Sequence, residues 1–303
     1  MTVTGIGVAR RSGTAPLTDR PKTDWIAYLF ISFFTLPFFI FNILPIIFGF
    51  YVSFTKWGVF GAPTWIGLDN YRNAITDEFV QIAFENTLLY GLIIVPSVMV
   101  LGLTAALYVN QRWPLSTLVR VCFFSPYVVS ATVIGLIWVW LLDTQFGLIN
   151  HYLGFVGISD TPWLTSPDFA IYGVSIASVW WDMGLAFVLF LSALQDIPEE
   201  LYDAAKVDGA NRAQQLWHIT LPHLRTVAST IGTLQLISTL RIFSQVFVMT
   251  SGGPASSSSS VLYQIYFEAI RNHKYGYASA ISMLLFLLIL GITLVSRRLI
   301  RET

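Results

Sequence analysis

Long stretches without a charged side chain are the feature that most limits how this chain can fold. Residues 25–55 (31 residues), 86–111 (26), 121–142 (22) and 275–296 (22) contain no Lys, Arg, Asp or Glu. A bilayer core about 30 Å thick is crossed by about 20 apolar residues of helix, so each run can span a membrane. Two further stretches qualify, with one ionisable residue inside each, Asp182 and Arg241. The sequence therefore predicts an all-α membrane protein with six transmembrane helices, at roughly 27–54, 85–109, 119–142, 170–194, 226–250 and 277–297.

The composition excludes several other classes of protein. Hydrophobic residues make up 55% of the 303 residues and charged residues only 11%, against roughly 25% in a soluble domain. Seventeen basic residues balance seventeen acidic ones, so no net charge favours nucleic acid. The single cysteine, Cys122, excludes an internal disulfide. Residues 1–24 are expected to form a flexible cytoplasmic tail, followed by a transmembrane domain over 25–303.

Basic residues are divided unequally between alternate loops. When Arg241 is set aside, twelve lie on one side of the predicted topology and four on the other. Loops rich in Lys and Arg stay in the cytoplasm. We therefore expect a multi-pass protein of the cell membrane with both termini in the cytoplasm. The four residues on the outer side are Lys56, Arg72, Arg271 and Lys274.

The segment between the fourth and fifth spans, residues 195–225, has a helical pattern of its own. Asp196 is expected to cap a helix over 198–207, and Gly209 is expected to end it. Asn211 can cap a second short helix, which Pro222 is expected to end. The predicted result is a helix-turn-helix on the inner membrane surface. It could be an interfacial anchor or a docking element for a cytoplasmic partner.

The residues of this segment also match a known pattern. Asp203-Ala204-Ala205, Gly209, Ile219 and Leu221-Pro222 resemble, in type and spacing, the cytoplasmic signature of permease subunits in binding-protein-dependent ABC importers. The family usually begins this signature with Glu-Ala-Ala, and Asp203 keeps the charge with one methylene fewer.

Further matches extend the resemblance over residues 28–297. They point to the maltose-type carbohydrate permeases, and among these to the first of two unlike membrane subunits. Ser244 stands where relatives often carry Asp, so any role of that carboxylate is not carried over. The matching stretches are Leu36-Pro37, Ser53-Phe54-Thr55, Gly67-Leu68-Asp69-Asn70-Tyr71, Gly147-Leu148-Ile149-Asn150 and Thr250-Ser251-Gly252-Gly253-Pro254.

The resemblance implies a type I ABC importer permease with a cytoplasmic coupling helix between spans four and five. It implies three kinds of partner: a second unlike permease, two cytoplasmic ATPase subunits and an extracytoplasmic solute-binding protein. The chain has no phosphate-binding Gly-rich loop. We therefore expect no enzymatic activity and no cofactor of its own, with ATP and Mg used by the ATPase subunits. The residues implied in ATPase coupling are Glu199, Glu200, Leu201, Asp203, Ala204, Ala205, Gly209, Ile219, Leu221 and Pro222.

Asp182 and Arg241 are the two ionisable residues placed within predicted spans, where such residues are often functional. At 1.5 Å of rise per residue their depths differ by less than one helical turn, so a salt bridge between spans four and five is geometrically possible. We predict that the two residues interact or at least face one polar cavity. The pair could lock the bundle or face a substrate pathway, or a span boundary could be misplaced. Trp181, beside Asp182, and Gln245, one turn after Arg241, are candidates for the same pathway. No metal site is expected.

Two other functions remain open from the residues alone. A secondary transporter could couple proton flow to solute through Asp182, but no internal repeat supports it. An intramembrane hydrolase would need a buried Ser-His or two-Asp arrangement, which the predicted spans lack. The sequence does not name the sugar. Residues 251–260, rich in Gly and Ser, are expected to be a flexible linker between spans five and six.

Overall fold

The structure is a computed structural model that describes residues 25–111, 116–158 and 160–301. The predicted tail, residues 1–24, lies outside the described residues. The chain divides into two compact units, residues 1–48 and 49–303, and each is described by itself. The first unit holds Trp25–Phe38 (α1), Phe39–Ile43 (η1) and the start of Leu44–Ser53 (α2). These helices follow one another without a break, and residues 28–53 are long and apolar enough to cross a membrane.

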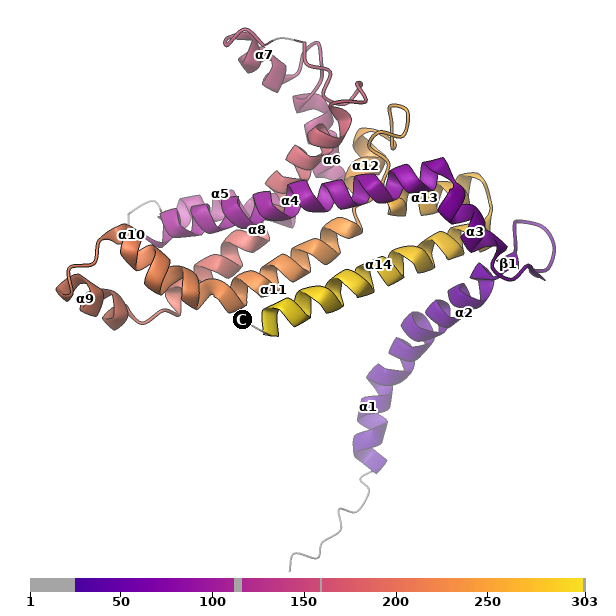
Figure 1. Cartoon of the computed structure of the whole chain (residues 1–303), viewed down its shortest axis with the longest axis horizontal. Coiled ribbons are helices and arrows are strands. Elements are labelled where there is room, and N and C mark those ends of the chain that lie inside the picture. The colour runs from indigo at the N-terminus through magenta and orange to yellow at the C-terminus, as the bar shows by residue number, and fades with distance from the viewer. Residues whose placement is uncertain (1–24, 112–115, 159, 302–303) are drawn as a thin grey trace, which may run out of the picture. The chain divides into compact units, whose positions relative to one another are not determined.

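Four long helices form the body of the second unit and run side by side in Figure 1: Glu78–Asn110 (α4), Ala170–Gln195 (α8), Leu221–Leu240 (α11) and Tyr275–Arg301 (α14). The packing of α4 against α8 depends on small residues. A Cβ atom on Gly102 of α4 would lie 2.9 Å from the Cβ atom of Ala186. Small residues allow two membrane helices to approach closely, so their main chains can pack tightly. Among the described helices α4, α8 and α14 meet the length and hydropathy of a span, as does the helix over 28–53.

The third predicted span, 119–142, is not one helix. It consists of Ser116–Val128 (α5) and Ala131–Leu141 (α6), whose axes differ by 103°. Pro126 lies in the last turn of α5 and has no N–H to donate. Ser130 then starts a new helix, because its Oγ accepts a hydrogen bond from the N–H of Val133 at 3.4 Å. The charge pattern does not reveal this elbow, because residues 121–142 form one uncharged run across it.

The fifth predicted span, 226–250, is also broken. Helix α11 ends at Leu240, and Ser244–Met249 (α12) begins after three residues that include Arg241. Arg241 and Phe243 have φ angles of −107° and −138°, outside the helical range. With these two breaks, the described chain has four or five candidate spans rather than a clear six.

Short elements connect the long helices. Thr55–Lys56 (β1) and Thr64–Trp65 (β2) pair antiparallel, with Thr55 opposite Trp65. Asp69–Thr76 (α3) precedes α4, and Leu148–Gly154 (α7) follows α6. Val261–Tyr266 (α13) continues directly into Phe267–Arg271 (η3) before α14. Within the second unit, α3 and α13 lie at one end of the long helices, which we call the α3 end (Figure 1).

The segment 251–260 is not the flexible linker that its composition predicts. Ser258, Ser259 and Ser260 are at most 2% exposed. Asn86 of α4 donates hydrogen bonds to the carbonyl oxygens of Ser256 and Ser259, both at 3.1 Å. The Tyr90 hydroxyl donates to the Ser258 carbonyl at 3.0 Å. These bonds fold the segment onto α4, because each satisfies a backbone group that burial removes from water.

Candidate functional site

A helical segment between α8 and α11 occupies the other end of the long helices, which we call the α9 end (Figure 1). Its first helix is Glu199–Val207 (α9), with Glu199 and Glu200 in the first turn and Lys206 in the last. These charges complement the helix dipole. Gly209 has a φ of +80° and ends the helix as predicted, because glycine adopts this left-handed conformation without strain.

Two details of this segment differ from the sequence analysis. Asp196 does not cap α9: it follows the last residue of α8, and α9 has Pro198 as its N-cap without a side-chain hydrogen bond. Pro222 does not end a helix either. It lies in the first turn of α11, directly after the π-helical turn η2, and the helix continues through it.

The second short helix has the cap that the sequence predicts. Asn211 precedes Arg212–Gln215 (α10), and its side chain accepts a hydrogen bond from the N–H of Gln214 at 2.9 Å. The Gln214 side chain accepts one in return from the N–H of Asn211 at 2.8 Å. This reciprocal capping box fixes the start of the helix. α10 then continues through Leu216–Thr220 (η2) into α11.

Most of the residues that the resemblance assigns to coupling are exposed. Leu201 is 39% exposed, while Ala205, Ile219 and Leu221 are partly buried. The fully exposed members are Glu199, Glu200, Asp203, Ala204, Gly209 and Pro222. The segment therefore presents small and apolar side chains on its surface, where another backbone could approach closely.

The sequence analysis missed the residue that fixes α9 in place. The hydroxyl of Tyr202 lies 2.9 Å from the Oγ1 atom of Thr220 in η2. Both residues are at least partly buried. Tyr202 is the one aromatic side chain of α9. Its partner lies 18 residues further along the chain, so the local pattern around Ala205 does not reveal the contact. The hydrogen bond joins the two halves of the segment.

The four candidate pathway residues line one cavity in the body of the second unit. Trp181 and Asp182 of α8 reach it from one side, and Arg241 and Gln245 reach it from the break between α11 and α12. Its volume is about 170 Å³, and its wall also includes Ser178, Ser238, Thr239 and Ser244. Polar side chains at this depth in an apolar bundle can hold water or a polar solute.

The hydrogen-bond partner of Asp182 is Gln235, not Arg241. Gln235 Nε2 donates to Asp182 Oδ2 at 2.7 Å. Among the described residues, Asp182 and Arg241 form no ion pair within 4.0 Å. The two residues therefore form no salt bridge, but they line one cavity, as the broader form of the prediction expects. The break at Arg241 changes the direction of the chain, so depth along a continuous helix could not predict the contact.

Trp181 is held in a fixed orientation beside Asp182. Its indole Nε1 donates to the carbonyl of Val129 at 3.0 Å, and its ring stacks on Tyr127 at 5.8 Å between centroids. Val129 lies in the elbow between α5 and α6. The bond thus satisfies one backbone group that the elbow leaves without a helical partner.

Two polar residues not selected from the sequence lie at this cavity: Thr239 lines it, and Gln235 bonds to Asp182, which lines it. Gln235 and Thr239 are 5% and 3% exposed, and within the described chain Thr239 Oγ1 has no hydrogen-bond partner. The sequence feature that could have identified them is an uncharged polar residue inside an apolar span. Such a residue needs a partner, because burial of an amide in hydrocarbon is costly without one. The cavity therefore combines hydrogen-bond donors and acceptors, including the guanidinium of Arg241 and the carboxyl group of Asp182. This combination suits a solute rich in hydroxyl groups.

The chain is similar in sequence to known transport proteins. Residues 98–301 match the family described as "Binding-protein-dependent transport system inner membrane component". The probable ABC transporter permease protein YurN of Bacillus subtilis is 31% identical over 90% of this chain and 95% of the relative. The trehalose/maltose transport system permease protein MalF of Thermococcus litoralis is 31% identical over 89% of this chain and 92% of the relative.

A solved structure has the same fold. It belongs to a bacterial ABC transporter involved in the import of the acidic polysaccharide alginate, and its matching chain superposes with a TM-score of 0.82. The alignment covers 92% of this chain and 96% of the other at 23% identity. A second structure of a bacterial alginate ABC transporter, in complex with an alginate pentasaccharide-bound periplasmic protein, has the same TM-score.

Proposed function

Because the chain belongs to the family of binding-protein-dependent transport system inner membrane components, we propose that it is the permease subunit of an ATP-driven importer for a sugar or a sugar-like solute. The observation that carries this proposal is the exposed α9 segment at one end of a bundle of membrane-spanning helices. Through such a segment, a subunit without an ATPase site can receive force from a partner subunit that hydrolyses ATP.

The α9 segment is proposed as the coupling element. Two cytoplasmic ATPase subunits bind ATP and Mg, and one of them receives α9 in a surface cleft. Leu201 and Val207, which are 39% and 88% exposed, bury apolar area on docking. Ala204 and Gly209 allow close backbone approach. The acidic residues Glu199, Glu200, Asp203 and Asp208 orient the contact more than they strengthen it.

Replacing one exposed alanine tests the docking. Ala204→Trp should abolish co-purification of the ATPase subunits and coupled uptake, because an indole prevents close approach of α9. Ala213→Trp, at an exposed alanine on the neighbouring α10, is the matched control and should leave both unchanged. Both variants should reach the membrane at the level of the original chain. ATPase recruitment and uptake by Ala204→Trp equal to the control would refute the docking site.

The substrate class is proposed as a sugar. Relatives include permeases named for trehalose and maltose and for multiple sugars. The cavity lined by Trp181, Asp182, Arg241 and Gln245 is proposed as part of the pathway, since it combines an indole ring with groups that donate and accept hydrogen bonds. Its small volume implies that it widens when the subunit changes conformation.

The complete importer is proposed to contain a second, unlike permease and an extracytoplasmic solute-binding protein. The six predicted spans then enclose one pathway together with the second permease. The surface of that partner covers the two broken spans. Non-helical backbone at membrane depth must be covered by protein or must line a water-filled cavity. The breaks at Ser130 and Arg241 fit this requirement if the second permease faces them.

A further inference from the structure

A second polar cavity lies at the α3 end, apart from the pathway cavity and the α9 segment. Its volume is about 560 Å³, within the roughly 300–1,000 Å³ typical of small-molecule sites. It is enclosed by the start of α4, the 251–260 segment, α13 and η3. Tyr263 and Phe267 form an aromatic wall, with ring centroids 6.4 Å apart and planes inclined by 29°.

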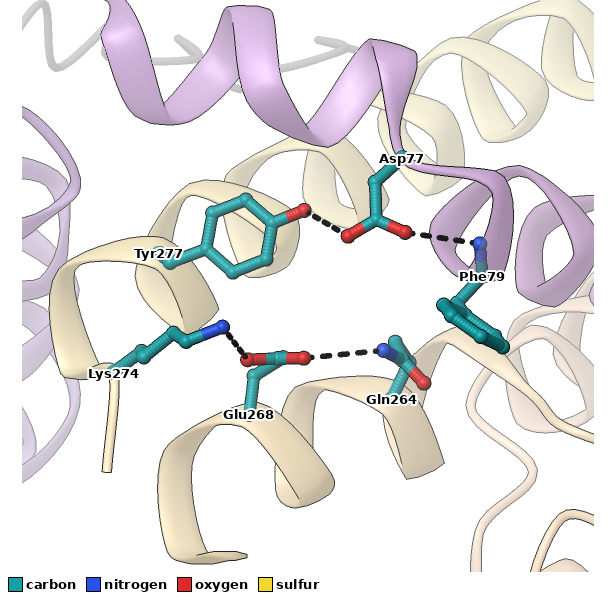
Figure 2. A network of polar contacts seen from close by, with 6 residues as sticks. All are labelled: Asp77, Phe79, Gln264, Glu268, Lys274 and Tyr277. Atoms are coloured by element: carbon teal, nitrogen blue, oxygen red, sulfur yellow. Dashed lines mark hydrogen bonds and ion pairs between the residues drawn. The ribbon is translucent and has the colours of Figure 1, made fainter. Parts of the chain in front are cut away.

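A network of polar contacts holds one side of this cavity (Figure 2). Asp77 Oδ2 accepts a hydrogen bond from the Tyr277 hydroxyl at 2.8 Å, and Asp77 Oδ1 accepts one from the N–H of Phe79 at 2.9 Å. Glu268, which is 6% exposed, lies 3.2 Å from the ammonium of Lys274. Both carboxylates are therefore fixed in place before any ligand arrives.

The charge balance of these groups restricts the ligand. Each Asp77 oxygen already has a donor, and Glu268 is paired with Lys274. Asp77 keeps its negative charge, but both of its oxygens already accept hydrogen bonds, so direct ligation of a cation there would displace a donor. Within the described residues no group of three or more His, Cys, Asp or Glu could hold a metal ion. An anion is disfavoured too, because two carboxylates face one ammonium.

The remaining groups suit neutral hydroxyls. Asn272 offers an amide that both donates and accepts, and Ser256 offers a hydroxyl. Gln264 donates one N–H to Glu268 at 3.5 Å and keeps its second N–H and its oxygen for a ligand. The Ser251 hydroxyl donates to the carbonyl of Phe247 at 3.2 Å and can accept from a ligand. Ser259 also lines the cavity. It is 2% exposed, and its Oγ has no hydrogen-bond partner among the described residues.

The aromatic wall is positioned by the main chain of the 251–260 segment. Gly252 lies so close to Tyr263 that a Cβ atom would be 2.5 Å from Tyr263 Cε1. The absence of a side chain at Gly252 therefore lets this segment rest against the ring. The 251–260 segment thus forms one wall of the cavity. Its hydrogen bonds to Asn86 and Tyr90 of α4 hold that wall in place.

We propose that this cavity binds one unit of a neutral sugar, whose apolar face packs on Phe267 while its hydroxyls bond to Gln264 and Asn272. This inference rests on the proposed function as a sugar permease and adds an entry site to it. The same 251–260 segment reaches the pathway cavity, since Ser260 Oγ donates to the carbonyl of Ile242 at 2.7 Å. A sugar in the entry site is thus separated from the pathway by this one segment.

A local spectroscopic probe tests the entry site without disturbing the fold. 4-Fluorophenylalanine is placed at Phe267 in the importer assembled without its solute-binding protein, and the fluorine resonance is followed while maltose, trehalose or an arabinotriose is added. At least one sugar should shift the resonance saturably. Phe247, which is also 39% exposed but does not line the cavity, is the matched control and should not shift.

A substitution at the rim provides the second measurement. Asn272 is exposed, so Asn272→Ala should leave the fold intact. It should weaken the sugar titration seen at Phe267 about three- to tenfold, as expected for lost hydrogen bonds. No shift with any of the three sugars, equal shifts at Phe267 and Phe247, or an unchanged titration in Asn272→Ala would each overturn the entry site. If the complete importer still takes up sugar, the proposed function survives that result; if no sugar is taken up, the proposed function itself fails.

Discussion

Asp182 shows how a membrane protein can keep a carboxyl group inside a bundle without an opposite charge. The amide of Gln235 donates to it at 2.7 Å, and the side chain is 7% exposed. A neutral donor satisfies the oxygen but leaves Arg241 available on the same cavity. The carboxyl group and the guanidinium therefore line the cavity separately, rather than as a closed pair.

This arrangement predicts which residue is coupled energetically to Asp182. In double-mutant cycles on the free energy of unfolding in micelles, Asp182→Leu and Gln235→Leu should show a coupling of about 1.5–3 kcal/mol, the value for a hydrogen bond to a charged group. The control cycle with Asp182→Leu and Arg241→Gln should show a smaller coupling. A coupling to Arg241 as large as that to Gln235 would contradict the observed geometry.

At the scale of elements, the 251–260 segment shows that composition does not decide order. Its Gly and Ser residues have little side chain to pack, so the segment is held through its backbone. Asn86 and Tyr90 of α4 supply three of these hydrogen bonds. The segment is therefore attached to α4 through its backbone and is not an independent linker.

Removing the asparagine should release the segment. Asn86→Ala leaves the carbonyls of Ser256 and Ser259 without this donor, and each unsatisfied buried group costs about 1–3 kcal/mol. We expect faster proteolytic cleavage within 251–260. Asn73→Ala, at an exposed position of α3, serves as the control and should be cleaved like the original chain. Equal cleavage rates in the two variants would show that other contacts hold the segment.

The end of α9 depends on the conformation of Gly209. A residue other than glycine at a φ of +80° is strained, and Asn tolerates this region better than Ala. Gly209→Ala should therefore increase amide hydrogen exchange in the last turn of α9, with Gly209→Asn intermediate. The physical reason is the loss of about 1 kcal/mol or more where the backbone cannot adopt φ > 0. Identical exchange in all three proteins would mean that the turn is not needed to end the helix.

At the scale of the whole molecule, we propose that both termini lie in the cytoplasm, because twelve basic residues lie on one side of the predicted topology and four on the other. A reporter active only outside the membrane should be silent after Thr303 and active after Gly157, which is exposed in the loop beyond α7. The 251–260 segment is not used for insertion because Ser258, Ser259 and Ser260 are buried. A reporter active only in the cytoplasm should give the reverse pattern. Activity of the first reporter at Thr303 would overturn the proposed topology.

The sequence by itself determined the membrane class, most long helices and the signature of the α9 segment. These depend on local properties: an uncharged run can be read without knowing its neighbours, and Gly209 or Asn211 ends or caps a helix through bonds within a few residues. The predicted spans that correspond to α4, α8 and α14 were identified from such local properties.

Only the tertiary structure decided the elbow at Ser130, the partner of Asp182 and the order of residues 251–260. Asp182 and Gln235 are 53 residues apart in the chain, and Asn86 and Ser259 are 173 apart. Whether such groups meet depends on how whole helices pack and where they break. Backbone and buried polar groups in an apolar bundle must find donors and acceptors, and the packed fold supplies them from distant parts of the chain.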